Sequence, residues 1–83
     1  MKTVLIIDDD EAMRQSLAEL LEMNGFATQT LENGTKAVEV CTKKEINCII
    51  VDIFMPDTDG IATVSALRKH CPGIPKIAIS GGM

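Results

Sequence analysis

Short apolar runs alternate along the chain with longer stretches of mixed polarity. Most of these runs are continuously apolar, which is typical of strands that are buried on both faces of a parallel sheet. Val4–Ile7 shows this best, because it is wholly aliphatic and stops at a group of acidic residues. We expect strands at Val4–Ile7, Phe26–Leu31, Cys48–Val51 and Lys76–Ile79.

The stretches between the runs have the spacing of amphipathic helices. A first helix is expected over Glu11–Met23, with Asn24-Gly25 as its stop signal. A second helix follows the turn at Asn33-Gly34, and a third follows Asp59-Gly60 and breaks at Pro72-Gly73. The apolar stripe expected on the first helix is formed by Met13, Leu17, Leu20 and Leu21. The second helix carries Ala37, Val38 and Cys41, and on the third we expect Ile61, Val64, Leu67 and Cys71 to face inward.

The order of elements is strand-helix-strand-helix-strand-helix-strand. Right-handed crossovers place such strands in one parallel sheet with helices on both faces, a doubly wound α/β architecture. Ligand sites in these folds lie beyond the carboxyl ends of the strands. Three of the four expected strands end there in Asp8, Asp52 and Ser80, so polar chemistry should converge on this edge.

The composition fits one small domain with an aliphatic core, since 46% of the 83 residues are hydrophobic and the only aromatic residues are two Phe. A net charge of -4, without a basic stripe, argues against binding to nucleic acid. The run Val4–Ile7 is too short for a signal peptide or a membrane span. We therefore expect a cytoplasmic protein with no membrane partner.

The three cysteines, Cys41, Cys48 and Cys71, have no C-x-x-C spacing, and the chain has a single histidine, His70. This set cannot supply four zinc ligands at motif spacing, and an odd number of cysteines does not favour a disulfide framework. Reduced thiols packed in the interior are expected.

The acidic run Asp8-Asp9-Asp10-Glu11 fits, by itself, the start of a helix, where acidic side chains cap amides and complement the macrodipole. Asp52 favours a second interpretation, because the topology brings it to the same edge as Asp8 and Asp9. Carboxylates sharing one pocket repel each other unless a hard cation such as Mg²⁺ neutralises them. We expect a divalent-metal site there.

A carboxylate beside such a cation can also act as a nucleophile toward a phosphoryl group. Asp52 is best placed for this role. Ser80 has a hydroxyl that could donate to a phosphoryl oxygen, although a plain turn at the end of a strand explains it equally well.

The sequence resembles the response-regulator receivers over essentially its whole length. The segments that carry the resemblance are Val4–Glu11, Asn24–Phe26, Asn33–Ala37, Asp52–Gly60 and Ile74–Gly81. Among these, D-x-x-M-P-x-x-D-G in register with an earlier acidic pair is highly specific.

The resemblance implies a flavodoxin-like receiver fold in which Asp52 accepts a phosphoryl group from a sensor histidine kinase or phosphotransfer protein. Asp9, Asp52 and the backbone carbonyl of Phe54 would bind Mg²⁺ directly, and Asp8 would bind it through water. Ser80 would be the switch hydroxyl. Such a module is a signalling phosphoacceptor that assists its own phosphorylation and hydrolysis, not a conventional enzyme.

By the same resemblance, residues 1–83 form the N-terminal portion of a receiver and stop before its last helix, strand and helix. The family's Lys on the fifth strand then has no counterpart, and Lys76 begins the fourth strand at the opposite end. The fourth strand would be an exposed edge, so self-association of the chain is expected.

Two other functions are compatible with the sequence. A receiver-like module could dock partners without phosphorylation. Alternatively, Asp8 and Asp10 have the D-x-D spacing of haloacid-dehalogenase phosphatases, although Ala12 stands where that motif has Thr or Val and the chain is short for that fold.

Overall fold

The computed structural model describes residues 1–53 and 60–79. The elements of this part of the chain are β1 (Thr3–Ile7), α1 (Glu11–Met23), β2 (Ala27–Leu31), α2 (Ala37–Lys43), β3 (Cys48–Asp52), α3 (Gly60–His70) and β4 (Lys76–Ile79). They confirm the order expected from the sequence. The first helix and the fourth strand have the predicted bounds, and the other strands differ from prediction by one residue at one end.

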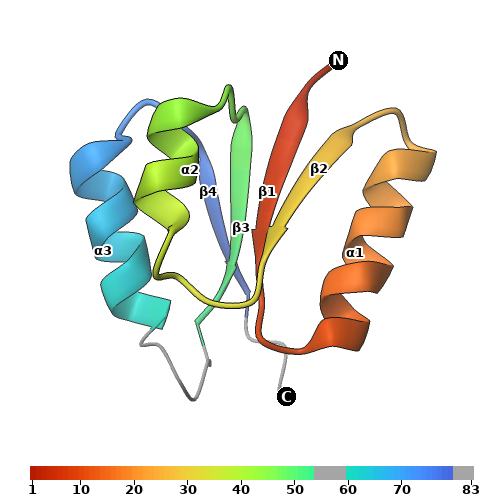
Figure 1. Cartoon of the computed structure of the whole chain (residues 1–83), viewed down its shortest axis with the longest axis horizontal. Coiled ribbons are helices and arrows are strands. Elements are labelled where there is room, and N and C mark those ends of the chain that lie inside the picture. Colours follow the sequence, from red (N-terminus) through yellow and green to blue (C-terminus); the bar gives the residue numbers. More distant parts are fainter. Residues whose placement is uncertain (54–59, 80–83) are drawn as a thin grey trace.

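The strands form one parallel sheet in the order β2-β1-β3-β4. Figure 1 shows α1 on one side of the sheet and α2 with α3 on the other, which is the doubly wound arrangement. All strands point the same way, so their carboxyl ends meet at a single edge, the lower one in Figure 1. The site discussed below lies at this edge.

The hydrophobic core lies between the sheet and the pair α2 and α3. Alternate residues of β1 and β3 face it, because successive side chains of a strand point to opposite faces. Leu5, Ile7, Ile49 and Val51 pack there with Ala37, Cys41, Ile46, Leu67 and Cys71. The core is therefore aliphatic, as the composition indicates.

Two predicted inward positions are wrong. Leu20 of α1 is 56% exposed, because the half-buried stripe of this helix runs through Met13, Leu17 and Leu21 and Leu20 lies at its margin. Ile61 of α3 is 65% exposed, whereas Thr63 is buried with Leu67 one turn later. In both helices the apolar spacing extends one position beyond the face that is buried.

The three cysteines are free, as expected. Cys41 and Cys71 are buried and Cys48 is half-buried. Burial raises the pKa of the Cys41 thiol to about 11, and the neighbouring Cys71 contributes in the same direction. At neutral pH Cys41 is therefore a protonated, poorly nucleophilic thiol. None of the described helices is long and apolar enough to cross a membrane.

Candidate functional site

The turn between β1 and α1 holds Asp8 in a defined position. The Asp8 N–H donates to the carbonyl of Leu31 on β2 (3.1 Å), and Asp8 Oδ1 accepts from the Asp10 N–H (2.9 Å). The Asp8 carbonyl accepts from Nη1 of Arg14 in the first turns of α1 (2.8 Å). Asp8 is therefore fixed by β2, by the turn and by α1.

Asp10, unlike Asp8, hydrogen-bonds to the first turn of α1. Its Oδ1 accepts from the N–H groups of Ala12 (3.0 Å) and Met13 (3.3 Å), so it is the N-cap of α1. The capping explanation of the acidic run is thus right for Asp10. Because that carboxylate is engaged with the helix, the structure gives no support to the paired use of Asp8 and Asp10 that the phosphatase alternative requires.

Asp52 ends β3, the strand that pairs with β1. The pairing aligns Ile7 with Val51, so the residues that follow them, Asp8 and Asp52, leave the sheet side by side. The Ile53 N–H donates to the carbonyl of Ile79 on β4 (2.9 Å) and continues the ladder just past the aspartate. Asp52 is therefore held from both neighbouring strands.

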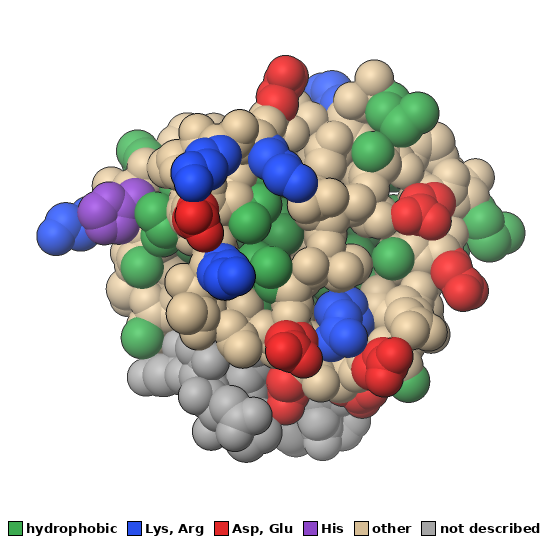
Figure 2. All heavy atoms as spheres, in the orientation of Figure 1, with side chains coloured by type: hydrophobic (Ala, Val, Ile, Leu, Met, Phe, Trp, Pro, Cys, Tyr) green, Lys and Arg blue, Asp and Glu red, His purple; other side chains and the backbone are tan. Residues whose placement is uncertain are grey.

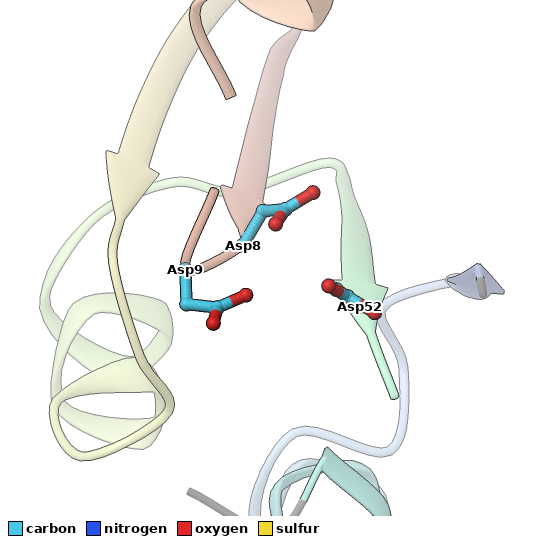
Figure 3. Close-up of side chains that lie close together, drawn as sticks. All are labelled: Asp8, Asp9 and Asp52. Carbon is cyan, nitrogen blue, oxygen red and sulfur yellow. The ribbon is translucent and has the colours of Figure 1, made fainter. Parts of the chain in front are cut away.

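The carboxylates of Asp8, Asp9 and Asp52 converge. One oxygen from each lies within 4.8 Å of the others, and Figure 3 shows the three side chains around a common space at the ends of β1 and β3. Asp8 and Asp52 are buried, whereas Asp9 is exposed, so the cluster has a solvent-facing side. On the face drawn in Figure 2, acidic side chains gather at this same lower edge.

The electrostatics of the cluster call for a cation. Asp8 Oδ2 is buried and has no hydrogen-bond partner among the residues that the structure describes. Burial raises the pKa of the Asp8 carboxyl; the Asp10 amide opposes this rise, and the Asp52 and Asp9 carboxylates add to it. A hard divalent cation with oxygen ligands, such as Mg²⁺, would satisfy the orphaned oxygen and neutralise the repulsion. The residues present therefore fit Mg²⁺.

Two of the residues expected in the site, Ser80 and Phe54, lie outside the described residues. Their roles as switch hydroxyl and carbonyl ligand stay predictions. Lys76, at the opposite end of the sheet, has its Nζ within 2.6 Å of the carbonyls of Cys71 and Ile74. It closes the turn before β4 and does not reach the acidic cluster, as expected.

Gly60, the first residue of α3, touches the end of β3 beside Asp52. A Cβ at this position would lie 2.7 Å from the carbonyl oxygen of Asp52 and would also collide with the Cα of Ile53. Both are backbone atoms, so no side-chain rotation can relieve the contact. The absence of a side chain at Gly60 lets α3 begin directly against the strand that carries Asp52.

We predict that Gly60→Ala lowers the free energy of unfolding by about 3 kcal/mol, the upper part of the range for overpacking. The measurement is urea denaturation followed by circular dichroism. Gly73→Ala is the matched control, because a Cβ there would meet nothing within 4 Å. Equal stabilities of the two variants would contradict the close approach.

The family model of the response regulator receiver domain matches residues 4–82. The chain belongs to this family. A curated relative, the putative response regulator NtrX-like of Rickettsia typhi, is 35% identical over 80 residues. That alignment covers 94% of this chain but 17% of the relative, so the receiver corresponds to a small part of the longer protein.

Solved structures agree with this assignment. The receiver matches response regulator TrrA of Thermotoga maritima in complex with Mg²⁺-BeF, with a TM-score of 0.87, 31% identity, and coverage of 94% of this chain and 68% of that one. It also matches TrrA in a complex with the histidine kinase ThkA, with a TM-score of 0.85 and 31% identity over 94% of this chain and 67% of that one. The flavodoxin-like receiver fold is thereby confirmed.

The sequence predicted that Asp8, Asp9 and Asp52 lie at one edge of the sheet, which the structure confirms, but it did not indicate the contact of Arg14 with Asp8 or the close packing at Gly60. One feature of the sequence could have indicated a role for Arg14, namely its position near the start of the first helix. A cation in the first turns of a helix opposes the macrodipole, so such a residue suggests a specific partner. The close packing at Gly60 could not be predicted beyond the turn-forming Asp59-Gly60 pair, because this packing depends on where β3 and α3 meet.

Proposed function

We propose that this receiver takes a phosphoryl group from a phosphohistidine onto Asp52, with Mg²⁺ held at Asp8, Asp9 and Asp52. The observation that supports the proposal is the convergence of these three carboxylates within 4.8 Å at the carboxyl edge of the sheet. Two of the three are buried, which is unfavourable for an aspartate without a compensating cation. Such a site is better explained by function than by stability.

In the proposed reaction a carboxylate oxygen of Asp52 attacks phosphorus as the donor's N–P bond breaks. An acyl phosphate O–P bond forms, and the imidazole leaves with the electron pair of the broken bond. Bound Mg²⁺ would neutralise charge on the transferring phosphoryl oxygens. Asp9 would contribute a ligand oxygen directly and Asp8 would bind the cation through water, while the neighbouring strands β1 and β4 hold Asp52 in place.

We further propose that the Phe54 carbonyl completes the metal ligands and that Ser80 reports phosphorylation through its hydroxyl. The donor would be a sensor histidine kinase or a phosphotransfer protein. The solved complex of the relative TrrA with ThkA supports a kinase as partner. The receiver itself is a signalling module that assists phosphoryl transfer and later hydrolysis.

The test is formation of an acyl phosphate from a small-molecule donor. The protein is incubated with acetyl phosphate and Mg²⁺, and intact-mass spectrometry is expected to show one added phosphoryl group that is absent when EDTA is included. Failure to form the adduct at saturating Mg²⁺ would defeat the phosphoacceptor function. The receiver would then be better described as a docking module that works without phosphorylation.

We also propose that the 83-residue chain self-associates through β4. This strand lies at one edge of the described sheet, and its Ile77 is 51% exposed while Ile79 is half-buried. An edge strand with uncovered apolar side chains can pair with another copy. Light scattering after size-exclusion chromatography is expected to show a dimer or larger species that Ile77→Lys shifts toward monomer. A wild-type monomer at high concentration would count against this.

A further inference from the structure

Arg14 lies in the first turns of α1 and contacts the backbone of the acidic cluster. Its Nη1 donates to the carbonyl oxygen of Asp8 at 2.8 Å, across six residues of sequence. The side chain is half-buried. It therefore links the beginning of α1 to Asp8, the residue that directly follows β1.

Besides Oδ2, Asp8 has three hydrogen-bonding groups, and each of them makes a bond that holds the residue in place. The N–H is bound to β2, Oδ1 is bound to the turn, and the carbonyl is bound to Arg14. Oδ2 is buried and has no hydrogen-bond partner among the described residues, and Figure 3 shows the side chain of Asp8 beside those of Asp9 and Asp52. Of the three partners in these bonds, Leu31 and Asp10 contribute backbone groups and Arg14 contributes its side chain.

An external restraint is needed here because the carboxylates of the cluster repel each other. One carboxylate oxygen from each of Asp8, Asp9 and Asp52 lies within 4.8 Å of the others, and like charges at this separation repel each other when no cation lies between them. A charge-assisted bond to the Asp8 carbonyl resists displacement of Asp8 by that repulsion. The same positive charge slightly destabilises α1, because a cation near the N-terminus of a helix opposes the macrodipole.

We propose that Arg14 is a positioning residue for the metal site, keeping Asp8 and Asp9 in place against Asp52 before the cation binds. This inference rests on the proposed function, since it assigns Arg14 a part in the same Mg²⁺ site. Arg14 contacts neither the cation nor the phosphoryl group. It acts through the hydrogen bond to the Asp8 carbonyl.

Geometry and charge predict opposite effects of removing Arg14. If the residue acted only as a positive charge near three carboxylates, Arg14→Ala would strengthen Mg²⁺ binding, because a repelling cation is lost. If it positions Asp8, the same variant would weaken binding, as removal of groups that orient metal ligands typically does by 10- to 100-fold. The sign of the change therefore distinguishes the two roles.

The experiment is a Mg²⁺ titration of wild type, Arg14→Ala, Arg14→Lys and Arg68→Ala by calorimetry. Arg68, exposed in the last turn of α3, is the matched control for loss of one positive charge. We expect Arg14→Ala to raise the dissociation constant about tenfold, Arg14→Lys to recover most of the loss, and Arg68→Ala to leave it unchanged or slightly lower. Metal-free melting curves of all four proteins set a temperature at which each is folded.

Unchanged or tighter binding in Arg14→Ala would overturn the inference. An equal weakening in Arg68→Ala would do the same, because the effect would then belong to net charge. If wild type itself bound no Mg²⁺, the proposed function would fail first. If wild type bound Mg²⁺ and Arg14→Ala bound it with the same dissociation constant, the proposed metal site would stand and only the positioning role of Arg14 would be lost.

Discussion

Asp52→Asn is expected to abolish phosphorylation by acetyl phosphate completely. The substitution keeps the size of the side chain and removes the anionic oxygen that would attack phosphorus, so the acyl phosphate cannot form. Asp52 is only 4% exposed, and an isosteric amide is the least disruptive change at such a position. Intact-mass spectrometry after incubation with Mg²⁺ and acetyl phosphate is expected to show only the unmodified variant.

Glu45→Gln provides the matched control for Asp52→Asn. Glu45 is exposed between α2 and β3, and this variant loses one negative charge without touching the acidic cluster. It is expected to be phosphorylated as wild type is. A phosphoryl adduct of normal yield on Asp52→Asn, located by fragmentation at another acidic residue, would show that Asp52 is not the acceptor.

Asp8→Asn is expected to stabilise the metal-free protein at neutral pH and to remove its response to Mg²⁺. Wild type at about 10 times the Mg²⁺ dissociation constant should gain about 1.4 kcal/mol, a rise in melting temperature of about 5 to 10 °C. In the variant the buried anion and one ligand oxygen are both gone. Its melting temperature should therefore be higher without Mg²⁺ and nearly constant with it.

The pH dependence gives this prediction a sign. Burial raises the folded-state pKa of Asp8 above the ordinary value of 3.8. Well below pH 3.8 the carboxyl is protonated in both the folded and the unfolded state, so its burial does not lower the free energy of unfolding. As the pH rises from 3.8 through the raised folded-state pKa, the unfolded chain ionises first, so metal-free stability falls; above that pKa the loss is complete.

Melting curves of wild type and Asp8→Asn between pH 3.5 and pH 7.5, in EDTA and in Mg²⁺, measure both effects. The difference between the two metal-free proteins should grow as the pH rises through this window. Asp9→Ala is a useful companion, because Asp9 is exposed; it should lose the Mg²⁺ response without the gain in metal-free stability. A wild-type melting temperature indifferent to Mg²⁺ would show that the carboxylates do not share a cation.

Local pattern was enough to predict the elements of this protein. Continuous aliphatic runs such as Val4–Ile7 marked the strands, and Asn24-Gly25 marked the end of α1, where Gly25 has a positive φ of 92°. The ends of β1 and β3 could also be predicted, because the sequence changes from apolar to acidic at Asp8 and Asp52. Together with the handedness of crossovers, these signals predicted one parallel sheet with the acids at one edge.

Only the tertiary structure decided which faces are buried and which partners each acid has. Leu20 and Ile61 show that a helical stripe has borders that periodicity does not locate, because they depend on how much of the helix the sheet covers. The contact of Arg14 with the carbonyl of Asp8 likewise joins α1 to the end of β1. These outcomes depend on distances between atoms of separate elements, and a one-dimensional pattern records only the spacing within each element.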